Sequence, residues 1–458
     1  MPIPEQEPEE RRKNFNEVAL GYTEEMAQEE ARRCLQCKKP SCVPGCPVGI
    51  NIPEFVGYAA EGRWEEGYFS LKKYNALPAV CGRVCPQENQ CERVCVLSKK
   101  CEPVAIGRIE RFLADWYLKK NDMHPHGENM IKSDKKIAVV GSGPASVTVA
   151  GEMVQAGYHV SVFEALHSLG GVLVYGIPEF RLPKAIIQAE LDIVGDWGVT
   201  FEKNVLVGST ITLYDIFGLG FESIFLGTGA GLPYFLNVPG ENGLGIYSSN
   251  EYLTRINLMR ANRFPEYDTP ILVGKKVTVI GAGNTAMDSA RISRRLPQVE
   301  KVTIAYRRSR TEMPARAEEV VHAEQEGIDI QTLVAPVRYV LDNNHQVCAL
   351  EMIRMELGEP DERGRRRPVP LEGSEFIHET DTVVVAVGQG PNPLLMKATP
   401  EIETTKWGTI IVDEKTGMTS MRGVFAGGDI VSGGSTVISA MGAGKVASRS
   451  MIDYILNK

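Results

Sequence analysis

The amino-acid sequence predicts an α/β protein in which a cysteine-rich helical domain precedes two parallel-sheet domains, one inserted in the other. Nine of the ten cysteines fall within residues 34–101, among helical patterns. Two glycine-rich turns, near residues 141 and 281, each follow an apolar segment of strand length and precede a helical pattern. With 458 residues and 43% hydrophobic content, the chain is long enough for two or three such domains.

The composition excludes several classes of function. The formal net charge of −8 argues against a nucleic-acid partner, because phosphate binding needs a basic face. No run of 18 apolar residues occurs, so we expect no membrane span. Residues 1–13, MPIPEQEPEERRK, lack the apolar core of a secretory signal. We therefore expect a cytoplasmic protein.

Residues 1–130 form the expected helical domain. Apolar residues at helical spacing predict helices over residues 24–33, 52–61, 64–74 and 103–119. The His124–Gly127 segment, HPHG, interrupts the pattern with Pro and Gly and predicts a linker.

The cysteines of this domain form two blocks. The first has Cys34, Cys37, Cys42 and Cys46, followed by Pro47, and the second has Cys81, Cys85, Cys91 and Cys95. In a reducing cytosol, clustered cysteines indicate metal or redox chemistry more often than disulfides. A Pro after the last cysteine is typical of the bacterial ferredoxin run, whose fourth cysteine ligates a different cluster, although one gap here is longer. The favoured interpretation is that the cysteines bind iron–sulfur clusters, and the alternative is a zinc-binding domain.

The segment from residue 135 to 164 predicts a first dinucleotide site. It reads as strand, glycine turn, helix and second strand, with GSGPAS at the turn. Gly141 and Gly143 let the backbone turn and approach a pyrophosphate, while Ser146 is small enough for helix–strand packing. Glu164 ends the second strand and would accept hydrogen bonds from ribose hydroxyls. Pro144 and Ala145 complete the turn.

Residues 275–308 repeat this pattern and predict a second dinucleotide site. The turn residues are Gly281, Gly283, Asn284, Thr285 and Ala286. The second strand ends in Arg307 and Arg308 instead of an acid. A ribose 2′-phosphate favours arginine there and repels a carboxylate, so we expect NADP rather than NAD. The alternative is that these arginines form an ordinary solvated face.

Other features distinguish the first site. Residues 168–184, SLGGVLVYGIPEFRLPK, include Gly171 and are suited to close approach by a bulky ligand. Near the C-terminus, Gly428 and Asp429 precede a helix expected from about Ser435. Asp429 could accept hydrogen bonds from polyol hydroxyls, and the helix dipole could face a flavin. The alternative is a final strand and packing helix without a ligand.

Two strand patterns ending in glycine, residues 223–233 and 382–393, predict where the chain leaves one domain and returns. The first nucleotide domain is then discontinuous, over residues 131–260 and 386–458, with residues 261–385 inserted as the second. The basic run at residues 361–370 is typical of an exposed hairpin or loop.

Together these motifs resemble a known family: the FAD-containing small subunit of NADPH-dependent glutamate synthase. Its relatives are the large subunit of electron-bifurcating NADH-dependent ferredoxin:NADP oxidoreductase and the N-terminal part of dihydropyrimidine dehydrogenase. The resemblance covers nearly the whole chain. It is carried by CLQC, CPVGINIP, VCGRVCPQENQCERVC, AIGRIERF, GSGPAS, GIPEFRLPK, GAGNTAMD, YRRSRTEMPA and FAGGD.

The resemblance implies a helical iron–sulfur domain with two 4Fe–4S clusters, followed by two Rossmann-like domains, the first for FAD and the second for NADP(H). It implies that cluster one is held by Cys34, Cys37, Cys42 and Cys95. Cluster two would be held by Cys46, Cys85, Cys91 and Glu110. Cys81 and Cys101 would not be ligands.

The resemblance also implies an oxidoreductase subunit. Hydride would pass from NADPH to FAD, or in reverse, and single electrons would pass through the clusters to or from a partner subunit. The favoured interpretation is the large subunit of the bifurcating enzyme, with a ferredoxin- or NAD-linked flavoprotein as partner in a hetero-oligomer. The alternatives are the glutamate synthase small subunit, which needs a large partner, and a non-catalytic electron-transfer or assembly subunit. No catalytic side chain is expected, because the chemistry belongs to FAD.

Overall fold

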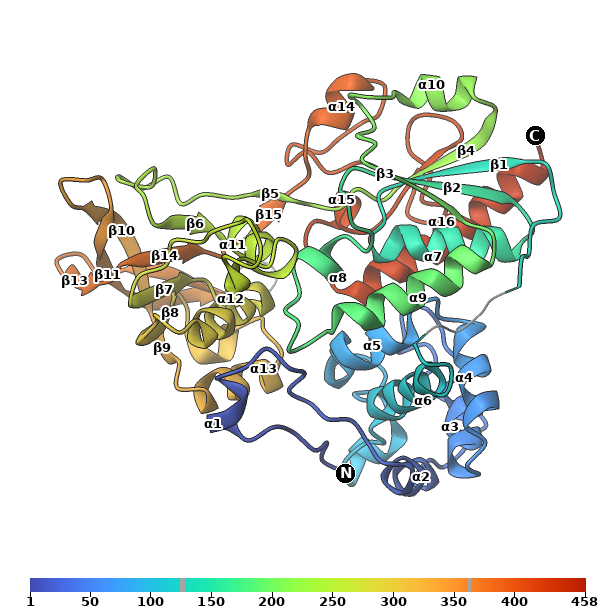
Figure 1. Ribbon diagram of the computed structural model, residues 1–458, viewed down its shortest axis with the longest axis horizontal. Coiled ribbons are helices and arrows are strands. Elements are labelled where there is room, and N and C mark those ends of the chain that lie inside the picture. The colour runs from blue at the N-terminus through green and yellow to red at the C-terminus, as the bar shows by residue number, and fades with distance from the viewer. Residues whose placement is uncertain (124–127, 361–363) are drawn as a thin grey trace.

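The computed structural model describes residues 1–123, 128–360 and 364–458. The linker predicted at 124–127 and residues 361–363 of the basic run lie outside the described residues. In Figure 1, the N-terminal helices lie below the two parallel sheets, which stand side by side. Across these ranges, no helix has the length and apolar character that a membrane crossing requires.

The N-terminal part is helical, as predicted. Its core includes the fully buried side chains of Phe55, Leu71, Ile109 and Leu113. The four predicted helices form with similar bounds, and α5, which ends at Val84 just before Cys85, was not predicted. Its helices are α1 (Pro8–Arg11), α2 (Glu24–Arg32), α3 (Ile52–Ala60), α4 (Trp64–Lys72), α5 (Pro78–Val84) and α6 (Ile106–Lys120), with 3₁₀ turns at Gln87–Asn89 and Val96–Lys99.

The first sheet is parallel, with strand order β16-β4-β1-β2-β3. Its strands are β1 (Lys136–Val140), β2 (His159–Glu164), β3 (Thr200–Lys203), β4 (Phe221–Leu226) and β16 (Val424–Ala426). Helices α7 (Pro144–Gln155), α9 (Lys184–Asp196) and α16 (Val437–Leu456) separate this sheet from the helical domain (Figure 1). Shorter helices complete it: α8 (Val172–Tyr175), α10 (Leu213–Gly218), α14 (Leu394–Ala398) and α15 (Asp429–Ser432). The predicted C-terminal helix starts two residues after Ser435.

The second sheet repeats the arrangement, with parallel order β6-β14-β7-β8-β9. Its strands are β6 (Ile246–Ser248), β7 (Lys276–Ile280), β8 (Lys301–Tyr306), β9 (Asp329–Thr332) and β14 (Thr382–Val385). One face packs on α11 (Ser249–Asn257), α12 (Asn284–Arg295) and α13 (Ala317–Gln325), with a further 3₁₀ turn at Ala261–Arg263 and another at Arg310–Glu312.

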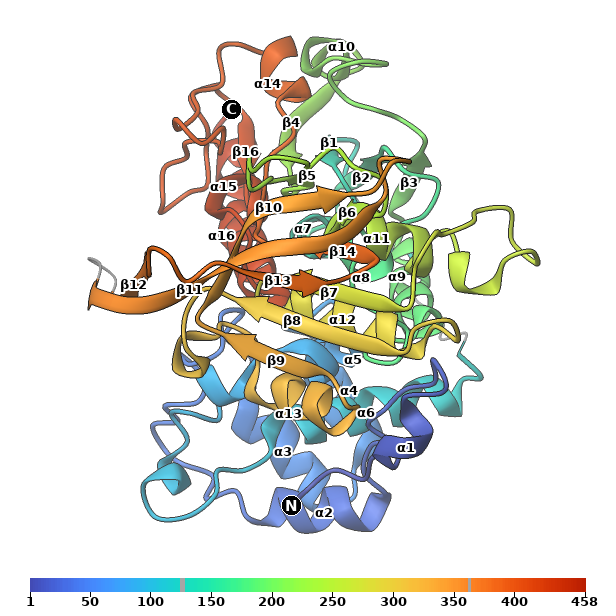
Figure 2. The same cartoon turned by 90° about the vertical axis from the view of Figure 1, so that its left-hand side faces the viewer.

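An antiparallel sheet covers the other face of the second sheet (Figure 2). It is formed by β10 (Val334–Leu341), β11 (Val347–Pro360), β12 (Arg366–Pro370) and β13 (Phe376–Glu379). The described part of the basic run, β12, pairs antiparallel with the end of β11 and is largely exposed. This agrees with the exposed hairpin that the sequence predicts.

The chain crosses between the sheets at the two predicted segments. There, β5 (Leu232–Pro233) and β15 (Gln389–Gly390) pair antiparallel, so the outgoing and returning chains lie side by side. Strand β6 already belongs to the second sheet, because it pairs with β14. The chain therefore enters the second sheet before residue 260, where the sequence places the domain boundary.

Helix α16 packs closely on two neighbours because it presents glycines to both. A Cβ atom at Gly444 would lie 2.7 Å from the carbonyl oxygen of Ala145 in α7. A Cβ atom at Gly442 would lie 2.8 Å from the carbonyl oxygen of Pro47, the residue after Cys46. Both distances are too short for a real carbon–oxygen contact, so a side chain at either position would push α16 away. Glycine at these two positions thus allows α16 to contact both α7 and the loop that carries Cys46.

A buried ionic network joins the N-terminal segment to the second nucleotide domain. The carboxylate of Glu326 lies 3.1 Å from Arg11, 2.8 Å from Arg291 and 2.6 Å from Arg295. All four side chains are almost completely buried. Burial alone would raise the pKa of Glu326, but the hydrogen bond from Arg295 and the charges of the arginines lower it to about 2.

The second half of the 168–184 segment takes part in this junction. The ring of Phe180 lies 4.0 Å from the guanidinium of Arg295. The backbone carbonyl of Phe180 accepts a hydrogen bond from the Val18 amide. Arg181 pairs with Asp288 and Glu319 at 2.8 and 2.9 Å. The end of this segment is therefore packed against the second nucleotide domain. Its beginning, at Gly170 and Gly171, contacts the first glycine turn.

We expect Glu326→Gln to destabilise the junction by about 3–5 kcal/mol, because three buried arginines lose their shared charge. For a chain of this length, the thermal unfolding midpoint should fall by about 3–5 °C. Glu300→Gln is the matched control, since Glu300 pairs with Lys275 on the surface and should cost less than about 1 kcal/mol. Equal midpoints for the two variants would contradict the proposed role of the network.

Candidate functional site

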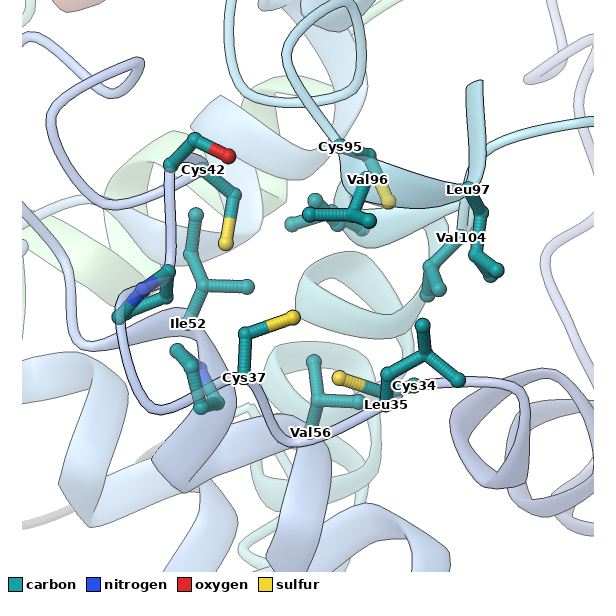
Figure 3. A pocket seen from close by; sticks show the side chains of 14 residues that line it. Cys34, Leu35, Cys37, Cys42, Ile52, Val56, Cys95, Val96, Leu97 and Val104 are labelled. Atoms are coloured by element: carbon teal, nitrogen blue, oxygen red, sulfur yellow. The ribbon is translucent and has the colours of Figure 1, made fainter. Parts of the chain in front are cut away.

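Four cysteine side chains converge on one pocket in the helical domain (Figure 3). Cys34, Cys37 and Cys42 come from the loop after α2, and Cys95 comes from the second block. The rest of the lining is largely apolar and includes Ile52, Val56, Leu97 and Val104. The sequence-predicted members of the first cluster are thus brought together.

The chemistry of this pocket fits a metal cluster. Burial, together with the charges of Cys34 and Cys95, raises the pKa of Cys42 to about 11. Thiols in such a site ionise only when a cation offsets the cost, and iron bound as a cluster supplies that charge. The apolar lining contributes no competing ligand.

The second predicted group also assembles. Cys46, Cys85 and Cys91 each experience the charge of Glu110, and Glu110 itself is buried on α6. Burial raises the pKa of Glu110 to about 8, although Asn75 donates a hydrogen bond of 2.8 Å to its Oε1. A buried carboxylate among three thiols fits an iron–sulfur cluster with one oxygen ligand.

Cys81, which is expected not to be a ligand, lies beside this group. Its Sγ is 3.5 Å from Met441 Sδ on α16 and 3.8 Å from Asn75 Oδ1, and a hydrogen bond with it helps to raise the pKa of Cys85. Cys81 lies in α5 and Cys85 is the residue that follows this helix, so the spacing of four residues, about one helical turn, was a signal that sequence reasoning could have used. Asn75 carries no comparable signal. Cys101 and Cys348 are exposed.

The first glycine turn forms a cradle at the start of α7. Gly141 has φ +92°, and a Cβ there would lie 2.7 Å from the carbonyl oxygen of Gly227. At Gly143 a Cβ would meet nothing within 4 Å, so open space faces the helix N-terminus. A pyrophosphate fits such a space, because backbone N–H groups and the helix dipole point into it. Ser146 is fully buried between strand and helix, as the packing argument predicts.

Two carboxylates lie near this cradle. Glu164 accepts hydrogen bonds of 2.9 Å from the Ser142 amide and 2.8 Å from the Leu166 amide, so it also braces the turn. A carboxylate has about four acceptor sites, which leaves room for a ribose hydroxyl. Burial raises the pKa of Asp429 to about 6, and its Oδ1 accepts a hydrogen bond from the Ser435 amide just before α16.

Tyr175 and the remaining glycines complete the first site. Burial, together with the charges of Asp429 and Glu164, raises the pKa of Tyr175 to about 12. Sequence reasoning did not single out Tyr175. A Cβ at Gly171 would lie 3.0 Å from Gly143, and one at Gly428 would lie 3.1 Å from the Cβ of Ala145. Gly171, Gly428 and the GSGPAS turn are therefore in direct contact.

The second glycine turn has the same geometry. Gly281 has φ +128°, and a Cβ there would lie 2.3 Å from the carbonyl oxygen of Ala386. Gly283 faces space that only Pro314 borders, at 4.0 Å. Asn284, the first residue of α12, accepts a hydrogen bond of 3.0 Å from the Arg316 amide, Thr285 follows it, and Ala286 is fully buried. This turn also fits a pyrophosphate.

The arginines after β8 differ in their partners. Arg307 is exposed and has no ion pair within the described ranges. Arg308 donates a hydrogen bond of 3.0 Å to the Arg366 carbonyl, and Arg310 pairs with Glu324. Arg307 is therefore the arginine with the most freedom to meet a phosphate.

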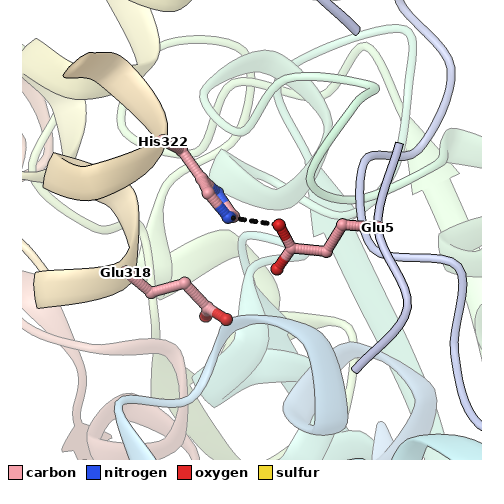
Figure 4. A group of neighbouring side chains, drawn as sticks. All are labelled: Glu5, Glu318 and His322. Carbon is pink, nitrogen blue, oxygen red and sulfur yellow. Dashed lines mark hydrogen bonds and ion pairs between the residues drawn. The ribbon is translucent and has the colours of Figure 1, made fainter. Parts of the chain in front are cut away.

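A further group of potential metal ligands lies between the N-terminal segment and α13 (Figure 4). Ligand atoms of Glu5, Glu318 and His322 lie within 4.8 Å of one another, and His322 Nε2 is 3.0 Å from Glu5. Glu5 also pairs with Arg11 at 3.1 Å, and Glu318 with Arg316 at 3.3 Å. Arginines already neutralise the charge of both carboxylates. We therefore interpret the group as a structural contact that holds the N-terminal segment against α13, as the Glu326 network does nearby.

Comparison with known proteins identifies the class of this chain. Residues 135–444 match the pyridine nucleotide-disulphide oxidoreductase family, and residues 11–122 match the dihydropyrimidine dehydrogenase domain II, 4Fe-4S cluster, family. Mycobacterium tuberculosis FprA, solved in complex with NADPH, superposes with a TM-score of 0.60 at 20% identity, over 71% of this chain and 85% of FprA. That likeness concerns the fold.

The curated relatives are more specific. The small chain of NADPH glutamate synthase from Azospirillum brasilense is 36% identical over 97% of this chain and 92% of its own. The beta subunit of NADP(+)-dependent formate dehydrogenase from Moorella thermoacetica is 38% identical over 90% of this chain, which spans 60% of that subunit. The chain belongs to the glutamate synthase small-chain family. It is an NADP(H)-dependent FAD and iron–sulfur oxidoreductase with 4Fe–4S centres.

We expect Glu110→Ala and Cys46→Ala each to remove the second cluster and spare the first, because each deletes one ligand of the second group. Iron content should fall by about half, with FAD and NADPH binding retained. Cys101→Ala, at an exposed position, is the control and should keep the full iron content. Unchanged cluster EPR signals in Glu110→Ala, or loss of the first cluster in Cys46→Ala, would contradict the assignment.

Proposed function

We propose that this chain is the NADP(H)-handling electron-transfer subunit of a larger redox enzyme. FAD would bind at the first glycine turn, NADP(H) at the second, and two 4Fe–4S clusters would bind the two ligand groups of the helical domain. When bound, FAD exchanges a hydride with the nicotinamide, and the clusters carry electrons singly. The chain's own residues hold these groups in place and keep water away.

The contact between α16 and the cysteine loop is the observation that carries this proposal. Just before α16, the Ser435 amide donates a hydrogen bond of 3.0 Å to Asp429, one of the residues proposed to contact FAD. Within two turns the same helix reaches Pro47 through Gly442 and Cys81 through Met441. The second ligand group therefore borders the flavin domain, whereas the pocket of the first group is lined by the helical domain alone. We propose the order flavin, second cluster, first cluster.

The residue assignments remain those that the resemblance implies. Cluster one would take Cys34, Cys37, Cys42 and Cys95, and cluster two would take Cys46, Cys85, Cys91 and Glu110. FAD would contact Gly141, Gly143, Pro144, Ala145, Ser146, Glu164, Gly171, Gly428 and Asp429. NADP would contact Gly281, Gly283, Asn284, Thr285, Ala286, Arg307 and Arg308.

The domain limits at residues 130, 260 and 385 also stay a prediction, and the pairing of β6 with β14 favours an earlier crossing than residue 260. We propose a cytoplasmic location, which suits thiol-ligated clusters in a reducing compartment.

For the partner, we propose a second redox subunit in a hetero-oligomer, as in the bifurcating ferredoxin:NADP oxidoreductases that the sequence resembles. The glutamate synthase small chain is a second candidate, favoured by the near end-to-end match to that chain. Co-purification distinguishes them: a small ferredoxin- or NAD-linked flavoprotein supports the first, and a large glutamine-cleaving subunit supports the second.

Anaerobic NADPH should bleach the flavin absorbance of the purified chain. In Arg307→Ala, bleaching by NADPH should slow roughly 10- to 100-fold at limiting NADPH, because a charge-assisted hydrogen bond to the 2′-phosphate is lost, while bleaching by NADH should not change. Arg310→Ala is the matched control, since Arg310 is already held by Glu324.

Absence of bleaching in the unmodified chain would overturn the proposal and favour the non-catalytic subunit. Equal losses in the two arginine variants would overturn the assignment of the 2′-phosphate to Arg307.

A further inference from the structure

The two segments that frame the first cysteine pocket carry only positive charge. Residues 32–46 and 93–101 contain seven lysines and arginines and no acid, in a chain whose net charge is −8. Six of the seven are exposed and have no ion pair within the described ranges. We call this set the basic rim: Arg32, Lys38, Lys39, Arg93, Lys99 and Lys100.

The same two segments also carry exposed apolar side chains. Leu35 is 60% exposed, Val96 42% and Val94 39%. Leu35 and Val96 also line the pocket of the first cysteine group, where Figure 3 shows them beside Cys34 and Cys95. The two segments that frame the first group therefore expose apolar and basic side chains next to one another in the sequence, a mixture of apolar and polar groups that protein interfaces also contain.

The second ligand group, in contrast, is covered by other parts of the protein. Cys85, Cys91 and Glu110 are all buried, and α16 covers that side. Electrons that arrive from the flavin domain would therefore leave through the pocket that the basic rim surrounds. This step rests on the proposed function.

We infer that the basic rim is the docking surface for a partner protein that presents an acidic face around a one-electron acceptor. Complementary charge steers such encounters and orients them, and the effect weakens with salt. Each NADPH supplies two electrons as a hydride and becomes NADP⁺. Two successive one-electron transfers across this surface then reduce two equivalents of the partner's acceptor, and one proton is released to solvent.

Direct binding tests this inference without relying on turnover. An acidic plant-type ferredoxin serves as the probe, and a basic c-type cytochrome is the probe of opposite charge. Association of the intact, cluster-loaded protein with each is measured by surface-based kinetics at several salt concentrations. We expect the ferredoxin to bind more tightly at low salt and the cytochrome to bind weakly throughout.

The variant replaces Lys38, Lys39, Lys99 and Lys100 with Glu. Ferredoxin association should fall at least about 10-fold at low salt, and cytochrome association should rise. The control replaces Lys203, Lys397, Lys406 and Lys415, which are exposed on the first sheet's domain and equal in number, and should behave as the unmodified protein. A milder variant with Gln at the four rim positions should lose part of the association, which keeps the test valid if the Glu variant folds poorly.

The flavin readout separates this inference from the proposed function. NADPH should bleach the flavin equally in all variants. If it bleaches the flavin in none, the proposed function fails while the binding result still stands. Equal ferredoxin association in the rim variant and the unmodified protein would overturn the inference. Binding of DNA or anionic vesicles in place of ferredoxin would overturn it too, because the basic rim would then serve a polyanion.

Discussion

The close contact of α16 with two neighbours is the constraint on which the arrangement of this protein depends. Gly444 allows α16 to lie against α7, which starts at the first glycine turn, and Gly442 allows it to lie against Pro47. One helix thus touches both the first glycine turn and the loop that carries Cys46. Lys445 adds a hydrogen bond of 2.6 Å to the carbonyl of Tyr74 in the helical domain. Buried Glu190 on α9 strengthens the same junction by pairing with Lys72 at 2.8 Å.

The second nucleotide domain is held against the rest of the protein by buried ion pairs instead. Arg11, Arg291 and Arg295 share Glu326, and Arg181 joins the loop after α8 to Asp288. Buried ion pairs stabilise little beyond their desolvation cost, but losing one partner is costly, so such pairs enforce one arrangement. The N-terminal segment takes part through Arg11 and through the Glu5–His322 contact in Figure 4. The helical domain and the two nucleotide domains are thereby held in one orientation.

Local patterns in the sequence predicted the elements well and their contacts poorly. Strand, glycine turn and helix at Gly141 and Gly281 are local features, and backbone sterics strongly favour glycine at the φ values of +92° and +128° found there. The convergence of Cys95 with Cys34 required the family resemblance, because loop geometry cannot be read from spacing. The burial of Phe180 and Arg181, the position of Cys81 and the pairing of Arg11 with Glu326 depend on residues far apart in the chain. No local signal marks them, and tertiary packing decides them.

The central claim is that the cysteines and Glu110 hold two iron–sulfur clusters in one body with a flavin. Quantitative analysis of iron, acid-labile sulfide, zinc and FAD in anaerobically purified protein tests it most directly. The account predicts about eight iron and about eight sulfide per FAD, with no stoichiometric zinc. Two zinc ions per chain without sulfide would contradict it, because the thiols would then form a structural zinc domain with no path for electrons.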